Sequence, residues 1–199
     1  MRVYEYSSGS WTQVGSDIDG ESANDNSGRS VSIDSDGSHV AIGAHENDGN
    51  GSNSGHVRIY SWDGSFWNQL GNDIDGEAAG DQSGYSVSID SDGSHVAIGA
   101  HYNDGYTGHV RIYSWDGEVW NQVGNDIDGE ATWDIFGHSV SIDSDGSHVA
   151  IGARNNDGNG SDSGHVRVYE YSSGSWAQVG SDIDGEAAYD YSGYSVSID

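Results

Sequence analysis

The sequence predicts an all-β protein, a β-propeller built from four-stranded antiparallel blades. Three observations support this prediction. The chain repeats itself, because the tyrosine of an Arg-Val/Ile-Tyr segment recurs at Tyr4, Tyr60, Tyr113 and Tyr169, at spacings of 56, 53 and 56 residues. Each copy contains four short segments in which apolar residues alternate with small or polar ones, as they do along β-strands. No segment has helical periodicity, and four-stranded units that repeat at about 50 residues are typical of propeller blades.

One copy of the repeat shows where its four strands are expected. The first strand, 86–89, alternates small polar and apolar residues, and the turn after it contains a glycine that can adopt a positive φ. The second strand, 96–100, has large residues on one face and Ala or Gly on the other. The third strand, 110–115, leads through a tight Asp-Gly turn into the fourth, 119–123. The copies differ in length only in a Gly/Asn/Ser stretch before the third strand, which marks a surface loop.

The alternation of large and small residues also favours a propeller. Blades pack face to face around an axis, so both faces of each sheet are partly buried. Val and Ile of one blade then pack against Gly, Ala and Ser of the next at close to crystal density. A sandwich with one solvated face more often shows charged residues opposite the Val and Ile positions.

The repeats divide the chain into about 3.5 to 4 blades. Residues 1–27 are expected to form the third and fourth strands of a first blade, and further blades are expected over 28–83, 84–136 and 137–192. Residues 193–199 are expected to be the first strand of a last blade. Such an array forms either a small closed ring with one deficient blade or an arc of a longer propeller. We favour the arc because both ends of the chain fall within a repeat.

The charge of the chain excludes several classes of function. Thirty-three acidic residues face six arginines, which gives a formal net charge of −27. This field repels nucleic acids and anionic membrane surfaces, and it favours cations, basic partners or a salty medium that screens the repulsion. The chain has no cysteine, hence no disulfide and no cysteine-based metal or redox motif. No signal peptide and no membrane-spanning run is evident, so we expect either a cytoplasmic protein or an export signal outside these residues.

Three short elements recur from copy to copy. Gly-Ala follows the second strand at 43–44, 99–100 and 152–153, and Gly-x-Val-x-Ile/Val-Tyr forms the third strand at 55–60 and its equivalents. Phe-Gly precedes the first strand at 136–137 and is Ser-Gly in the other copies. In these elements nearly the whole chain resembles the FG-GAP repeats of integrin α-subunit propellers and of related bacterial and marine surface proteins. The resemblance implies extracellular ligand binding and cell adhesion, and no catalysis.

The acidic block Asp-x-Asp-Gly-Glu is the candidate metal site. It places three carboxylates within five residues, and calcium binds several oxygen ligands that alternating aspartates can supply in a turn. The candidate ligands are Asp17, Asp19 and Glu21, Asp73, Asp75 and Glu77, Asp126, Asp128 and Glu130, and Asp182, Asp184 and Glu186, with Asp25, Asp81, Asp134 and Asp190 as additional donors. The alternative, which we favour, is a solvated acidic turn between two blades, because Ile18 is expected to point inward and separate the two aspartates as in a strand. The resemblance implies another calcium loop between the first and second strands, but here that loop (34–38) is short and lacks the distal carboxylate.

Other polar and aromatic residues have structural explanations that we prefer. The loop at 48–52 is either a weak calcium loop or a flexible turn, and we favour the turn. Two sets of histidines recur once per blade, so we expect no common metal among them; they are His39, His95 and His148, and His56, His109 and His165. The arginines of the third strands are expected to pair with nearby carboxylates. Tryptophans of the outer hairpins either pack between blades, which we favour, or stack on sugars; they are Trp62, Trp67, Trp115, Trp120 and Trp176.

The sequence as a whole favours a non-catalytic binding or adhesion module of a larger secreted or cell-surface protein, with calcium as an expected cofactor. No nucleophile elbow, phosphate-binding glycine loop or zinc-protease motif is present, so we expect no enzyme. The expected partner is a protein or glycan, together with further blades or flanking domains, and neither a nucleic acid nor a membrane. Two alternatives stay open: a carbohydrate-binding propeller, and a glycosidase or lyase with two carboxylates at a central cleft.

Overall fold

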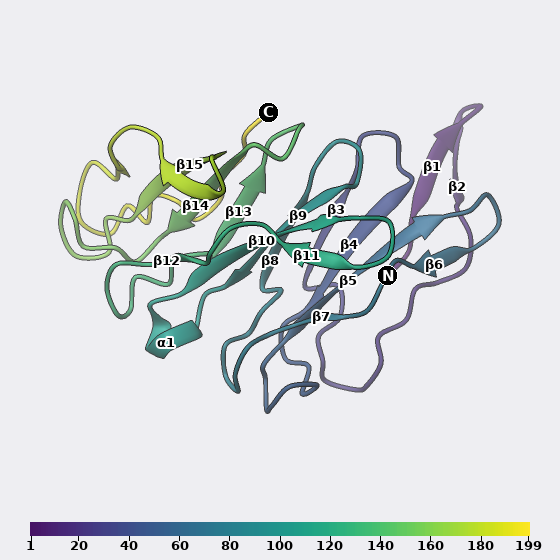
Figure 1. Cartoon of the computed structure of the whole chain (residues 1–199), viewed down its shortest axis with the longest axis horizontal. Coiled ribbons are helices and arrows are strands. Elements are labelled where there is room, and N and C mark those ends of the chain that lie inside the picture. Colours follow the sequence, from purple (N-terminus) through teal and green to yellow (C-terminus); the bar gives the residue numbers. More distant parts are fainter.

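The computed structural model describes all 199 residues and consists of strands, loops and one helical turn (Figure 1). A two-stranded hairpin, β1 (Tyr4–Ser7) and β2 (Ser10–Gln13), precedes three five-stranded sheets. The first sheet contains β3 (Ser30–Ile33), β4 (His39–Ala44), β5 (His56–Trp62), β6 (Trp67–Gln69) and β7 (Ile74–Asp75). The second contains β8 (Ser86–Ile89), β9 (His95–Ala100), β10 (His109–Trp115), β11 (Trp120–Gln122) and β12 (Ile127–Asp128). The third contains β13 (Ser139–Ile142), β14 (His148–Ala153), β15 (His165–Ser172), β16 (Ser175–Gln178) and β17 (Ile183–Asp184).

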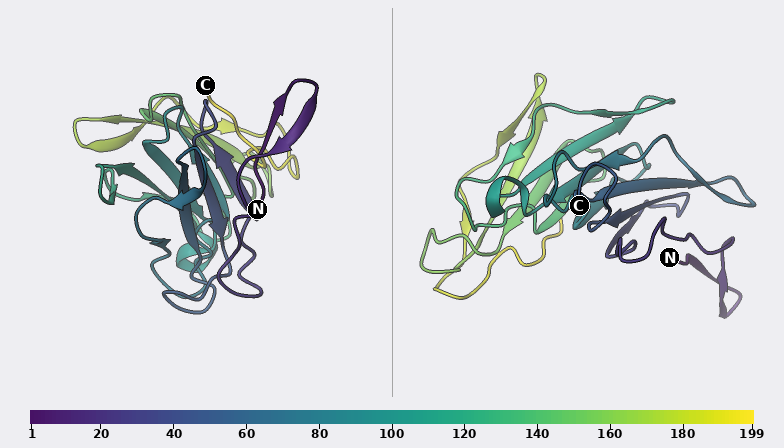
Figure 2. Two further views of the ribbon diagram at one scale, coloured as in Figure 1. Left: turned by 90° about the vertical axis from the view of Figure 1, so that its right-hand side faces the viewer. Right: turned by 90° about the horizontal axis from the view of Figure 1, so that it is seen from below.

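Each sheet is an antiparallel four-stranded blade with a short extra strand at its outer edge. The first four strands lie in chain order, as in β3-β4-β5-β6, and the fifth pairs with the third. Figure 2 shows the blades side by side in chain order, from the N-terminal hairpin to the C-terminal loops. The all-β propeller architecture predicted from the sequence is therefore confirmed. No helix of this structure combines the length and the apolar character needed to cross a bilayer.

The inner strands hold neighbouring blades together near the axis. Ser30 Oγ at the start of β3 donates to the carbonyl of Gly84, 2.7 Å away, and Ser86 Oγ donates to Gly137 in the same way at 2.8 Å. The blades form an open arc and do not close into a ring, so the small closed ring is excluded. On β3, where no complete blade precedes it, Val31 is 51% exposed, whereas its equivalent on β8, Val87, is 8% exposed.

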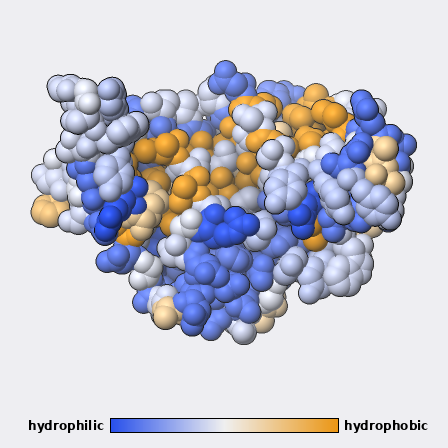
Figure 3. Space-filling view, turned by 180° about the vertical axis from the view of Figure 1, so that it is seen from behind, coloured by the Kyte–Doolittle hydropathy of each residue, from blue (hydrophilic) through white to orange (hydrophobic).

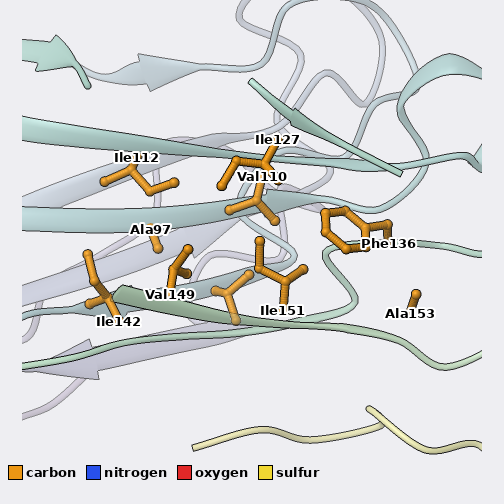
Figure 4. Packing of buried hydrophobic residues seen from close by; sticks show 10 residues of the cluster. Ala97, Val110, Ile112, Ile127, Phe136, Ile142, Val149, Ile151 and Ala153 are labelled. Atoms are coloured by element: carbon orange, nitrogen blue, oxygen red, sulfur yellow. The ribbon is translucent and has the colours of Figure 1, made fainter. Parts of the chain in front are cut away.

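The core lies between blades, where large residues meet small ones. Figure 4 shows Val110 and Ile112 of β10 facing Val149 and Ile151 of β14, with Phe136 closing one end. The close approach depends on glycine at one position of the second strand. A Cβ atom on Gly99 would lie 2.2 Å from the carbonyl oxygen of Gly137 in the next blade, so no other residue fits there. The large-against-small packing expected from the sequence is thus present.

The outer strand differs from the sequence prediction because it is interrupted. Residues 119–123 were expected to form one fourth strand followed by an acidic turn. In the structure β11 pairs with the second half of β10, and β12 then pairs with its first half. Gly124, at a φ of +75°, separates the two segments. The acidic block therefore borders a sheet, which holds its carboxylates at fixed positions.

Two local features also differ from the prediction. The short loop before β10 contains a helical turn, α1 (Asn103–Tyr106), whose residues Asp104 and Gly105 have positive φ and stop it from continuing. Residues 195–198, predicted as a strand, form none. Ile198 N–H still donates to Ser141 Oγ of β13 at 3.1 Å, as Ile142 does to Ser88. The segment lies where an inner strand would, and no strand of the structure pairs with it.

Candidate functional site

The first aspartate of each acidic block lies beside an arginine of its own blade. Arg58 on β5 donates to both carboxylate oxygens of Asp73, at 2.8 and 2.7 Å. Arg167 on β15 does the same with Asp182, and this pairing lowers the pKa of Asp182 to about 2. Arg2 pairs with Asp17 in the same way, at an exposed position. Bidentate pairing of the arginine with the first aspartate is therefore present in three of the four copies. In the remaining copy Arg111 lies 3.6 Å from Glu77, so the expected pairing of these arginines with carboxylates is present throughout.

The glutamate of each block points toward the next blade instead of its own. Glu21 forms an ion pair with Arg58, and Glu130 forms one with Arg167, so a single arginine bridges two acidic blocks. A buried histidine joins each bridge. The structure thus forms three groups, Glu21 with His56 and Asp73, Glu77 with His109 and Asp126, and Glu130 with His165 and Asp182, whose ligand atoms lie within 4.8 Å of one another.

The three carboxylates of one block therefore do not converge on a common point. Asp75, Asp128 and Asp184 end β7, β12 and β17 and lie opposite His56, His109 and His165 in the sheet. Burial raises the pKa of Asp75, while it lowers the pKa of His56, His109 and His165. Asp19 lies outside any strand, and Glu186 is exposed. The histidines were missed as group members because their contact depends on how neighbouring blades dock.

The middle group is arranged differently from the other two. Arg111 donates to the carbonyl of Asp75 at 2.9 Å and stays 3.6 Å from Glu77. Asp126 accepts its hydrogen bond from Gln122 and has no arginine partner. In this group alone, no guanidinium already occupies the space between the two carboxylates. A cation could enter this group without displacing an arginine.

The other candidate calcium ligands are used by the protein itself. Asp34, in the loop between β3 and β4, bonds to Ser38 Oγ and to His39 Nδ1, at 3.0 and 2.7 Å. Asp48 accepts a bond from Asn53 N–H within the long loop, and Asp25 accepts one from Asn47. The bonds of Asp34 and Asp48 lie within their own loops, and that of Asp25 joins two loops, in agreement with the structural explanation of these residues.

The tryptophans of the outer strands pack between blades. The indole N–H groups of Trp67, Trp120 and Trp176 donate to the carbonyls of Val14, Leu70 and Val123 in the preceding blade, at 2.8–2.9 Å. Trp62 and Trp115 lie against Trp67 and Trp120, with ring centroids 5.3 and 5.4 Å apart. The preferred explanation of these residues, inter-blade packing, is therefore confirmed.

A second candidate site, which the sequence analysis missed, lies at the axis. The starts of the inner strands enclose a groove of about 480 Å³, lined by residues 29–31, 85–87, 138–140 and 194–196. The Ser-Val pair is the same in all four segments, but the residue before it is Arg29, Tyr85, His138 or Tyr194. This variation between otherwise repeated copies was the signal available in the sequence.

Four side chains of the groove contact three further residues outside its lining, and we call all seven the axial cluster: Arg29, Tyr85, His138 and Tyr194 in the lining, and His45, His101 and Arg154 beside it. The ring of Tyr85 lies 3.7 Å from that of His101 and 5.3 Å from that of His138, whose own ring is 5.0 Å from Tyr194. Arg29 stacks over Tyr85 and donates to its hydroxyl at 2.9 Å. Burial lowers the pKa of His101 to about 3 and that of His138 to about 4.

Comparison with known proteins identifies the repeat. The family model described as FG-GAP repeat matches residues 16–60 and 126–169. The chain carries FG-GAP repeats. No curated protein matches it in sequence.

Solved structures similar to this FG-GAP chain are propellers of low sequence identity. A candidate 6-phosphogluconolactonase from Bacteroides uniformis superposes with a TM-score of 0.61 at 13% identity, over 92% of this chain and 47% of the other. Hydrazine synthase from Kuenenia stuttgartiensis gives 0.50 at 12%, over 86% and 42%. The FG-GAP chain thus spans about half the length of these proteins. Such identities show a common fold and nothing of activity.

Proposed function

We propose that this chain is a non-catalytic ligand-binding module whose ligand occupies the axial groove. The observation that supports this most directly is the variation among Arg29, Tyr85, His138 and Tyr194. Every other position of the inner strand repeats, whereas this position carries three residue types in four copies, and all four residues line one groove. Concave sites with a few convergent polar groups and several aromatic rings are typical binding sites. FG-GAP repeats are typical of extracellular proteins, and we place this module in a secreted or cell-surface protein that binds a protein or glycan.

The chemistry of the groove favours binding over catalysis. No aspartate or glutamate lines it, so it lacks the carboxylate pair that the glycosidase alternative requires. General-base catalysis works best with a pKa near the operating pH, but burial holds the pKa of His101 and His138 at about 3 and 4. Three of the four serine hydroxyls in the lining, those of Ser30, Ser86 and Ser139, donate to backbone carbonyls of the next blade.

The ligand-binding proposal can be tested with paired tyrosine variants. The wild-type chain is screened on an array of glycans and of immobilised proteins, and the ligands it retains are then offered to Tyr85→Ala/Tyr194→Ala. We expect this variant to lose binding, because the two rings form the walls of the groove. Tyr6→Ala/Tyr189→Ala removes two exposed tyrosines elsewhere and should bind as the wild type does. Equal binding by both double variants would place the ligand outside the groove.

Calcium support is a separate proposal, and we assign it to the group of Glu77, His109 and Asp126. The two carboxylates supply the oxygen ligands that calcium prefers, with water completing the shell, and no arginine bridges them. Millimolar calcium should then raise the melting temperature relative to EDTA at fixed ionic strength, because a ligand of the folded state stabilises it. Asp126→Asn should abolish this shift. If calcium gives no shift but sodium chloride raises the melting temperature, the calcium site is contradicted. The acidic composition would then be explained by adaptation to salt.

A further inference from the structure

Two of the six arginines are distinguished by their lack of an acidic partner. Arg2, Arg58, Arg111 and Arg167 each lie within ion-pair distance of a carboxylate. Arg29 and Arg154 form no ion pair, although the chain has 33 acidic residues. Both belong to the axial cluster. In so acidic a chain, an arginine without an ion pair indicates that its surroundings contain no acidic side chain within ion-pair distance.

Each of these arginines stacks on a tyrosine of the groove. The guanidinium carbon of Arg29 lies 4.5 Å from the ring centroid of Tyr85, and that of Arg154 lies 5.2 Å from that of Tyr194. Stacking orients a guanidinium but leaves its N–H edge free to bind an oxyanion with two parallel hydrogen bonds. Tyr85 and Tyr194 each contact the ring of His138. The two arginines therefore stand at either side of His138.

The cluster also contains buried polar atoms without a partner. The Nδ1 atoms of His45, His101 and His138 and the Nε atom of Arg154 are buried and form no hydrogen bond. All three histidines are at least nine-tenths buried. Unsatisfied buried polar groups are costly and rare in folded proteins. The chain has nine such atoms, on Asp34, His56, Ser83 and His165 as well as here, and four of the nine gather in this one cluster beside a groove. We take this concentration as a sign that polar groups are held there for a ligand.

The nearest acidic side chain lies at the border of the cluster. Glu46 is 3.7 Å from His45 Nε2, and it accepts a hydrogen bond from Asn26. Phosphate, sulfate and carboxylate groups are the natural partners of arginine side chains arranged in this way. The two guanidiniums provide one cationic end on each side of His138, which suits a ligand with more than one oxyanion group.

We propose that the axial groove binds a small ligand carrying carboxylate or sulfate groups, held between Arg29 and Arg154. This inference rests on the proposed function, since it names the chemical class of the groove ligand. Arg29 binds one oxyanion group at the rim, where its side chain is exposed. Arg154 binds at the opposite side beside Tyr194, and the ring of His138 lies between the two arginines. The ligand of this acidic protein is itself acidic.

The test measures binding of defined probes to the full chain by isothermal titration calorimetry. The probes are citrate, sodium sulfate, glucuronate and glucose, at constant ionic strength. Glucuronate and glucose differ in the carboxylate at C6, so they isolate the contribution of the charge. The variants are Arg29→Gln and Arg154→Gln, with Arg2→Gln as the matched control at an arginine outside the groove. Circular dichroism of each variant verifies that the sheets persist.

We expect citrate, with several carboxylates, to bind more tightly than glucuronate, and glucose to bind at least about tenfold more weakly than glucuronate. Arg29→Gln and Arg154→Gln should each lower the affinity for citrate by roughly tenfold or more, because a charge-assisted hydrogen bond is lost. Arg2→Gln should leave affinity unchanged. Binding of citrate alone identifies a carboxylate ligand, and binding of sulfate alone identifies a sulfate ester; either result supports the proposal.

Two results would overturn the inference. One is that none of the three anions binds, and the other is that anions bind equally well to wild type, Arg29→Gln and Arg154→Gln. The proposed function fails separately. If an uncharged ligand from the array binds and is lost only in Tyr85→Ala/Tyr194→Ala, the groove remains the binding site and its anionic specificity is wrong.

Discussion

Replacing Phe136 with alanine is expected to lower the free energy of unfolding by about 3–5 kcal/mol. Phe136 is 1% exposed and packs between the second and third blades, in the cluster that contains Val110 and Ile151. Removing its ring leaves a cavity that the rigid inter-blade interface cannot fill. Its backbone N–H bonds to the carbonyl of Thr107 at 3.0 Å, and this bond is retained in the variant. Urea unfolding followed by tryptophan fluorescence measures the loss.

The equivalent position in the preceding blade provides the control. Ser83 also stands before a glycine of the repeat, is fully buried, and its hydroxyl has no hydrogen-bond partner. Ser83→Ala should change stability by less than about 1 kcal/mol, because removing an unsatisfied hydroxyl costs little. A loss below 1 kcal/mol in Phe136→Ala would mean that the phenylalanine of the repeat motif does not stabilise this interface.

Acidification is expected to destabilise the protein through the axial histidines. The pKa is about 3 for His101 and about 4 for His138 in the folded chain, because burial disfavours the charged ring, against about 6.5 when unfolded. The unfolded state therefore binds more protons below pH 6.5. As the pH falls from 6.5 toward the pKa of the folded chain, each histidine lowers the free energy of unfolding by up to about 1.4 kcal/mol per pH unit. Between pH 6.5 and 5 the two together remove about 3 kcal/mol from the free energy of unfolding, because the unfolded rings are only half protonated at pH 6.5.

Other titrating groups also change the stability with pH, some in the same direction and some in the opposite one. Comparing the wild type with a histidine variant separates their effect from that of the axial histidines. Burial also lowers the pKa of His45, His56, His109 and His165, whereas Asp90 raises the pKa of His95 through a hydrogen bond. Asp182, with its pKa lowered to about 2 by Arg167, loses its contribution only below about pH 4. Urea unfolding at pH 7, 6 and 5 is therefore compared between wild type and His101→Phe. The free energy of unfolding of the variant should fall less steeply with decreasing pH than that of the wild type. An identical fall in both proteins would contradict a buried, neutral ring at His101.

The strands and their packing could be predicted from the sequence because they depend on local pattern. The Ser-Val-Ser-Ile segments form the inner strands, except at 195–198, where no paired strand follows. Gly99 and its equivalents signalled the close approach between blades. The interruption of the outer strand at Gly124 was missed, since one glycine in a polar stretch resembles a turn.

The candidate sites were less predictable because they join residues from different blades. Glu21 and Arg58 are 37 positions apart, and nothing in the acidic block indicates that its last residue pairs with the next blade. The axial cluster combines the residue before each inner strand with the residue after each second strand, such as Tyr85 and His101. Their proximity follows from the arrangement of blades around an axis, which the repeat length alone does not give.

The most direct test of the axial groove is a titration of the ¹⁵N-labelled protein with citrate, followed through the ring nitrogens of its histidines by NMR. The account predicts that the resonances of His138 shift most, because its ring lines the groove, and that those of His45 and His101 follow, because their rings contact Tyr85 of the same lining. His56, His109 and His165, which lie in the groups between blades, should stay unchanged. Shifts confined to His56, His109 and His165, or no shift at saturating citrate, would contradict an anion-binding groove at the axis.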